Sequence, residues 1–179
     1  LDATAAASKG VDRHALDCFG SDGAVTATLI SSGATNLTLW KKSGGSISLV
    51  QSAAVLGSAG GSDVALTRLS SGDIVVATAR GGALTLARWN TPNGSLHLLA
   101  KDIPAGPATT VALQPVANDM FLTAAIAPDG TFVLRSWRLV GTTLDHLGTY
   151  VEGSSSNPIT CSTGAFFGYR AILCRFCRP

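Results

Sequence analysis

The sequence predicts an all-β fold built from repeated four-stranded units. Three tryptophans recur at a nearly constant spacing, and each unit contains four short apolar segments that are separated by turn residues. The composition agrees with this pattern, because 20 glycines, many serines and threonines and a single methionine suit short strands and tight turns better than helices. The repeat therefore sets the frame in which each local element is interpreted.

The repeat is defined by two columns of residues. Trp40, Trp89 and Trp137 are 49 and 48 residues apart, and they end the segments TNLTLW, LTLARW and FVLRSW. Ile159 and Ala171 are twelve residues apart, and the same interval separates paired alanines in the earlier units, so a fourth unit begins near residue 157. The paired alanines are Ala15 and Ala27, Ala65 and Ala77, and Ala112 and Ala124.

Each unit contains four predicted β segments. In the second unit they cover about residues 63–69, 73–79, 84–90 and 95–101, and the separators are Ser71-Gly72, Arg80-Gly81-Gly82 and Pro92-Asn93-Gly94. The pair Asn93-Gly94 supplies the positive φ angles that a two-residue hairpin turn requires. The fourth segments lead into predicted loops that are rich in small residues and proline, such as AKDIPAGPAT.

Repeated four-stranded meanders of about 40 to 50 residues are typical of β-propeller blades. We predict a single repeat domain over 1–179, with blades over about 13–61, 62–108 and 109–156 and a partial fourth blade over 157–179. The alanines of the second strands would lie where neighbouring blades approach closely, and each tryptophan would pack between blades. The alternative fold is a β-trefoil with three four-stranded repeats, but the start of a fourth repeat has no place in it.

The repeat also resembles that of bacterial β-propeller repeat proteins. The matching elements are Val25-Thr26-Ala27, Val76-Ala77-Thr78 and Leu122-Thr123-Ala124, each followed by a segment of the form L-x-x-W. The resemblance covers about residues 13 to 173 and lacks the Trp-Asp and Gly-His pairs of WD repeats. It implies a fold class and carries no catalytic or binding residues.

Three blades and part of a fourth do not close a ring, since propellers need at least four. We expect either that copies associate as a homo-oligomer to complete a ring or that the sequence is a fragment of a longer propeller. The final residues LCRFCRP lack the turn glycines of the other units and indicate a shifted reading frame or a broken gene. In that case the chain would have no independent function.

Charge and hydropathy exclude two classes of partner. The net charge is +2 and 13% of residues are charged, so the electrostatic field of the chain is too weak to attract nucleic acid. No apolar run approaches the roughly 20 residues of a membrane-spanning helix. The compartment is left open, with a secreted or periplasmic location favoured.

The residues that carry chemistry are few, and we predict no catalytic, cofactor or metal site. His97 and His146 fall on predicted outermost strands, and we interpret them and His14 as surface residues. Cys174 and Cys177 have zinc-ligand spacing, but neither Cys18 nor Cys161 gives the second close pair that such a site needs, so a disulfide or inert thiols are favoured. Asn36 and Asn93 match the glycosylation pattern, which we interpret as chance matches in a Ser/Thr-rich chain.

The predicted function is therefore a non-catalytic scaffold or interaction module whose ligand-binding residues are unknown. A rigid repeat presents variable loops, here near Ser31–Thr35, Arg80–Gly82 and Pro128–Gly130, to a protein or carbohydrate partner. Two alternatives are a carbohydrate-binding lectin, with one sugar site per repeat, and a fragment or accessory domain of a larger extracellular hydrolase.

Overall fold

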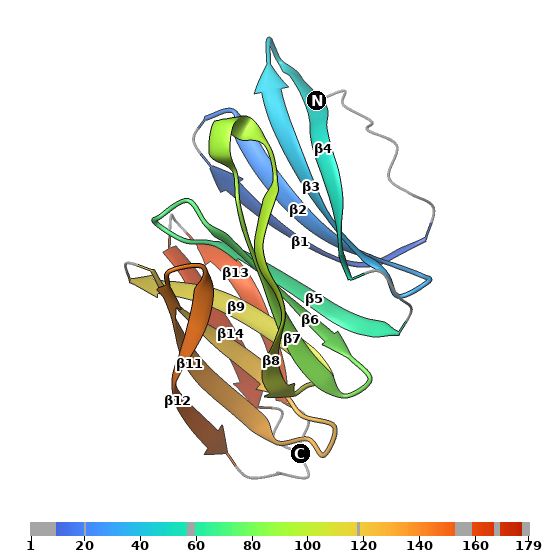
Figure 1. Cartoon of the computed structure of the whole chain (residues 1–179). Helices are drawn as coiled ribbons and strands as arrows, with labels where there is room; N and C mark the ends of the chain where they lie inside the picture. Colours follow the sequence, from blue (N-terminus) through green and yellow to red (C-terminus); the bar gives the residue numbers. More distant parts are fainter. Residues whose placement is uncertain are drawn as a thin grey trace.

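The computed structural model describes residues 10–19, 21–56, 60–117, 119–152, 159–166 and 169–176. These residues form three four-stranded antiparallel sheets and one two-stranded hairpin (Figure 1). In every sheet the strand order follows the chain order, so each sheet is a simple meander. Within these ranges no helix is long and apolar enough to cross a membrane.

Each sheet corresponds to one unit of the repeat. The first blade contains β1 (Val11–Phe19), β2 (Gly23–Ile30), β3 (Thr35–Ser43) and β4 (Ser46–Leu56). The second contains β5 (Gly61–Arg68), β6 (Ile74–Arg80), β7 (Ala83–Asn90) and β8 (His97–Pro107), and the third contains β9 (Thr110–Ala117), β10 (Met120–Ile126), β11 (Phe132–Val140) and β12 (Thr143–Glu152). The hairpin consists of β13 (Ile159–Phe166) and β14 (Tyr169–Phe176).

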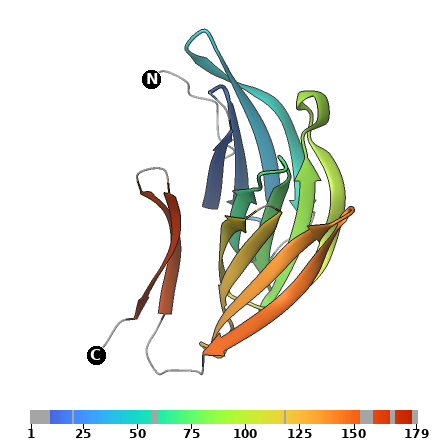
Figure 2. The ribbon, with the colours of Figure 1, turned by 90° about the vertical axis from the view of Figure 1, so that its left-hand side faces the viewer.

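The blades are arranged as in a propeller. The first strands β1, β5 and β9 are neighbours in space, and β13 lies next to β9. Figure 2 shows the hairpin on the side of these first strands, with the fourth strands farther away. The structure thus confirms a propeller-like all-β fold with three four-stranded blades and the start of a fourth.

The turns contain the predicted glycine and asparagine residues, and one of them differs from the prediction in turn type. β6 and β7 are joined by the two glycines Gly81 and Gly82, with φ of 55° and 81°. Asn93 and Gly94 have φ of 54° and 76°, as the Asn-Gly pair predicted, but they belong to a single 3₁₀ turn over Pro92–Gly94 rather than to a two-residue hairpin turn.

The end of the second blade differs from the prediction. β8 continues to Pro107, through residues that the sequence analysis assigned to a loop because of their proline and glycine content. β8 pairs with β7 alone, and its register shifts at several points along that pairing. An edge strand with bulges tolerates proline because its outer N–H groups need no partner.

The hydrophobic core lies between blades and forms two layers. In the first layer, Val25 and Ala27 of the first blade face Val76 and Trp89 of the second. In the second layer, the other side of the second blade, including Leu86, packs against the third blade. Side chains alternate between the two faces of each strand, so one blade contributes to two successive layers.

A buried alanine recurs at one position of each second strand. Ala27, Ala77 and Ala124 are fully buried, and each is flanked across its sheet by an alanine of the first strand and a leucine of the third. A larger side chain at these positions would overfill a packed layer and force the sheets apart. The alanine column is thus a packing feature of the second strand.

The tryptophans are not equivalent in burial. Trp89 and Trp137 are 5% and 3% exposed, each against the preceding blade, as the sequence predicted. Trp40 is only half-buried, contrary to that expectation. The reason is its position, because its face of the first blade has no further sheet against it in the part of the chain that the structure describes.

Candidate functional site

The turns between second and third strands form a common surface, which we call the turn face and define as Ser31–Thr35, Arg80–Gly82 and Pro128–Gly130 (Figure 1). The first two turns are held by the connection that enters the next blade. Gly61 N donates to Gly33 O (3.3 Å) and Ala108 N donates to Gly82 O (2.9 Å). The third turn is closed by its own hydrogen bonds, from Ala127 N to Thr131 O (2.8 Å) and from Gly130 N to Ala127 O (2.9 Å).

The turn face presents polar groups of mixed charge. Ser31 and Ser32 are exposed in the first turn, and Arg80 is half-buried at the start of the second. In the third turn the backbone N–H of Thr131 donates to the Asp129 carboxylate (2.9 Å), which lowers the pKa of Asp129 below its usual value. The exposed Asp129 therefore carries a full negative charge at neutral pH.

The histidines are not brought together. His14 lies on β1, His97 begins β8, and both are exposed. His146 on β12 is also exposed, but it does more than the sequence indicated: its ring lies 5.1 Å from that of Trp137 at an angle of 55°, and its Nε2 is 2.8 Å from Thr149 Oγ1. This ring covers one wall of an inter-blade pocket.

The cysteines form no metal centre in the described ranges, where no group of three or more His, Cys, Asp or Glu side chains could hold an ion. Cys18 is a free, exposed thiol on β1. The backbone positions of Cys161 and Cys174 are directly opposite in the β13–β14 hairpin. Cys177 lies outside the described residues, so the spacing of Cys174 and Cys177 stays a sequence observation.

The two glycosylation-pattern asparagines lie in different settings. Asn36 is half-buried on β3, whereas Asn93 is exposed in its turn. Only Asn93 has the surface position that such a modification needs.

A pocket of about 360 Å³ lies between the second and third blades. Its volume is at the lower end of the range for small-molecule sites. β8 contributes one wall, and β11 and β12 contribute the other. The lining residues are Ile103, Pro104, Ala105, Gly106, Arg135, Trp137, Leu144 and His146.

Arg135 is the charged residue of this pocket. Its Nη1 is buried without a hydrogen-bond partner, and no described carboxylate forms an ion pair with it. Burial lowers the pKa of the guanidinium below its usual value, although an arginine remains protonated at any physiological pH. The pocket therefore contains an uncompensated positive charge.

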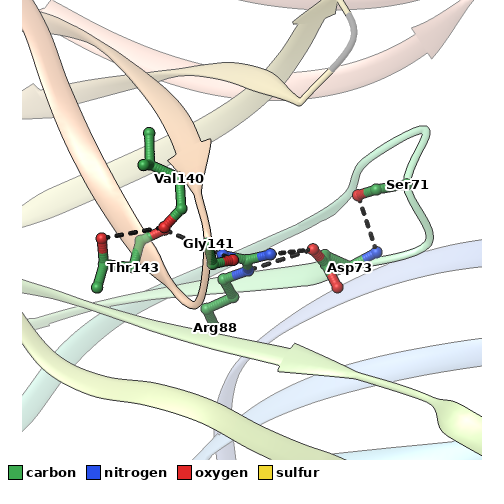
Figure 3. Close-up of polar contacts among 6 residues, drawn as sticks. All are labelled: Ser71, Asp73, Arg88, Val140, Gly141 and Thr143. Carbon is green, nitrogen blue, oxygen red and sulfur yellow. Dashed lines mark hydrogen bonds and ion pairs between the residues drawn. The ribbon is translucent and has the colours of Figure 1, made fainter.

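A second arginine, Arg88, is buried and has hydrogen-bond partners for its guanidinium. Arg88 on β7 and Asp73 form a buried ion pair, with Nη2 and Nε at 2.6 and 3.2 Å from the same Asp73 oxygen (Figure 3). Nη1 of Arg88 donates to the carbonyls of Gly141 and Thr143 in the third blade. Because all its donor nitrogens are engaged, Arg88 joins two blades and is closed to a ligand.

Two aspartates connect the first strands of neighbouring blades. Asp17 on β1 accepts a hydrogen bond from the backbone N–H of Arg68 on β5, and Asp63 on β5 accepts one from Val111 on β9 (both 2.8 Å). Burial raises the pKa of Asp63, while the backbone N–H groups of Val111 and Val64 and the charge of Arg13 oppose the shift. We interpret both aspartates as inter-blade links.

Arg135 was not among the residues predicted to be functional, although the repeat contains a signal for it. Arg135 pairs across the sheet with Thr123. The equivalent pairs are Thr38 with Thr26 in the first blade and Ala87 with Val76 in the second. An arginine in a column of small residues is an anomaly that comparing the repeats would reveal.

Comparisons with known proteins give no family for this chain. No protein-family model matches the chain, and no curated protein matches it in sequence. One similar solved structure is the crystal structure of a protein from Lactobacillus plantarum, at 11% identity and a TM-score of 0.45. The match covers 96% of this chain and 66% of the other, so the chain spans less than two thirds of that protein's length.

Proposed function

We propose that the chain is a non-catalytic interaction module that binds a protein partner on its turn face. The observation that supports this best is that backbone hydrogen bonds order all three turns, the first two through an inter-blade connection and the third through bonds within the turn. A turn that is already ordered loses little conformational entropy on binding, so its contacts contribute to affinity.

The chemistry of the turn face suits a polar protein surface. It offers hydroxyl groups from the first turn, a guanidinium from the second and an ionised carboxylate from the third. Mixed charge of this kind favours specificity and orientation over general attraction to a polyanion.

The lectin alternative has less support. A sugar site usually uses an aromatic platform, and the aromatic residue common to the units is the tryptophan. Trp89 and Trp137 are buried between blades and offer no such platform. A role as an accessory domain of a hydrolase stays a prediction.

The proposal is tested by mapping contacts. The wild-type chain is used to capture a partner from an extract, and hydrogen exchange of the purified complex is compared with that of the free chain. We expect protection of backbone amides in all three turns, and we expect a triple variant, Ser32→Ala, Arg80→Ser and Asp129→Ser, to lose at least about 90% of the captured partner.

The matched control lies on the opposite end of the first blade. Lys41 and Lys42 are on β3 next to the β3–β4 turn, and both are exposed. Lys42→Ser should bind the partner as the wild type does. Equal capture by the turn variant, or protection confined to residues outside the turn face, would contradict the proposal.

A further inference from the structure

We infer that the pocket between the second and third blades binds a small ligand with a carboxylate group and an apolar body, and that Arg135 holds the carboxylate. This site is separate from the turn face. Three observations support it. The guanidinium of Arg135 is unpaired in the part of the chain that the structure describes, Gly106 leaves room for that guanidinium, and aliphatic and aromatic side chains line the pocket.

The charge of Arg135 is unpaired among the described residues. A guanidinium that is partly removed from water without a counter-charge loses hydration energy and gains nothing in exchange. Arg88 shows how this chain satisfies a buried arginine, with Asp73 and two carbonyl oxygens. Arg135 has none of these, and its Nη1 lacks any partner in the described residues.

Blade packing does not require an arginine at this position. Thr38 and Ala87 occupy the equivalent positions of the first and second blades, and both blades form complete sheets with them. The long side chain of Arg135 is therefore an addition of the third blade.

Gly106 makes space for the guanidinium. A Cβ at this position would overlap Nη2 and Cζ of Arg135. Gly106 also has φ of 95°, which residues with a side chain rarely adopt. The glycine thus lets the planar guanidinium lie directly against the backbone of β8.

The walls of the pocket define the ligand. Arg135 is the only Lys or Arg among the described lining residues, and one positive charge matches one carboxylate, which arginine binds through two parallel hydrogen bonds. Ile103 and Leu144 add aliphatic surface, and Trp137 with His146 adds aromatic surface. A small aromatic or aliphatic acid satisfies both requirements.

Phenylacetate is a suitable probe, and its neutral analogue phenylacetamide differs only in the charged group. We would titrate the ¹⁵N-labelled full chain with each and follow backbone amide shifts. Saturable shifts at Gly106 and Leu144 are expected with phenylacetate, and at least about tenfold weaker binding is expected with phenylacetamide. Inorganic sulfate, tested alone, should bind at least about tenfold more weakly than phenylacetate, because it cannot use the apolar walls.

Variants then assign the charge. Arg135→Gln should weaken phenylacetate binding at least about tenfold, and Arg135→Lys, which keeps the charge but not the planar fork, should weaken it by less. The matched control is Arg138→Gln, because Arg138 is on the same strand, faces solvent and pairs only loosely with Asp145 at 3.9 Å. It should bind as the wild type does.

Several results would overturn the inference. They are an absence of saturable shifts at Gly106, equal binding of phenylacetamide or sulfate, and unchanged binding by a folded Arg135→Gln or Arg135→Lys variant. In those cases Arg135 would serve to cover apolar surface with its aliphatic stem. None of these outcomes affects the proposal for the turn face, which is tested with a different surface and probe.

Discussion

A single hydrogen bond distinguishes the tryptophans of the three blades. Trp40 Nε1 donates to Thr26 Oγ1 (2.9 Å), and Trp137 Nε1 donates to Thr123 Oγ1 (3.1 Å). The same register places Val76 beside Trp89, whose buried Nε1 has no partner in the described structure. A buried N–H without an acceptor reduces stability by about 1–3 kcal/mol.

Restoring the threonine should correct this defect. We expect Val76→Thr to leave the free energy of unfolding within about 0.5 kcal/mol of the wild type, because the bond to Trp89 offsets the burial of the hydroxyl. The control is Val133→Thr, at a site that is 3% exposed and pairs across the sheet with Ala125 and Val151.

That control has no such donor opposite it and should reduce the free energy of unfolding by about 1–3 kcal/mol. Urea unfolding of the three proteins, followed by circular dichroism, measures the difference. Equal losses for both variants would show that the Trp89 N–H is satisfied in another way.

At the scale of elements, Arg88 determines how the turn between β11 and β12 sits on the second blade. Its guanidinium is held by Asp73 within the second blade and reaches the carbonyls of Gly141 and Thr143 in the third (Figure 3). The Arg88 and Asp73 side chains are 8% and 11% exposed. Water can therefore hydrate little of the charge that is left unpaired when one partner is removed.

Breaking the pair should therefore be costly. Asp73→Asn is expected to lower the free energy of unfolding by about 3 kcal/mol, and the double variant Asp73→Leu with Arg88→Met should recover part of that loss, because no unpaired charge then remains. Thermal or urea unfolding gives the values. Asp145→Asn, which affects only the exposed pair with Arg138, should change stability by less than about 1 kcal/mol, and a similar small change for Asp73→Asn would contradict the assignment.

The elements also show what could be predicted from the sequence. The alternation of apolar residues and the glycine turns predicted 63–69 and 84–90, and the strands are Gly61–Arg68 and Ala83–Asn90. The last strand of the second blade was predicted to end at about 101 but ends at Pro107, because an edge strand with bulges accepts proline. That extension forms a wall of the Arg135 pocket, so a pocket between distant strands could not be located from local pattern alone.

At the scale of the whole molecule, the two core layers leave the outer face of the first blade without a cover among the described residues. Trp40 lies on this face and is half-buried, whereas the corresponding tryptophans of the later blades are nearly inaccessible. The repeat itself predicted the tryptophan positions. It could not predict their unequal burial, which depends on which sheet precedes each blade.

Fluorescence quenching by acrylamide tests this arrangement. Trp40→Phe should remove most of the quenchable emission, whereas Trp89→Phe should leave the quenchable component in place, because acrylamide reaches an indole only where solvent does. Circular dichroism on each variant would verify folding. If Trp40→Phe leaves the quenching unchanged, the face is covered in solution, as it would be if a second copy completed a ring.

The aspartates that link the first strands have a consequence for assembly. β5 and β9 each pair with one neighbour in their sheets, so their remaining edges carry backbone groups outside any ladder. The Asp17 carboxylate accepts a hydrogen bond from one backbone N–H of β5, and the Asp63 carboxylate accepts one from a backbone N–H of β9. A foreign strand would have to displace a carboxylate to pair there, which makes edge-to-edge aggregation along β5 and β9 unfavourable.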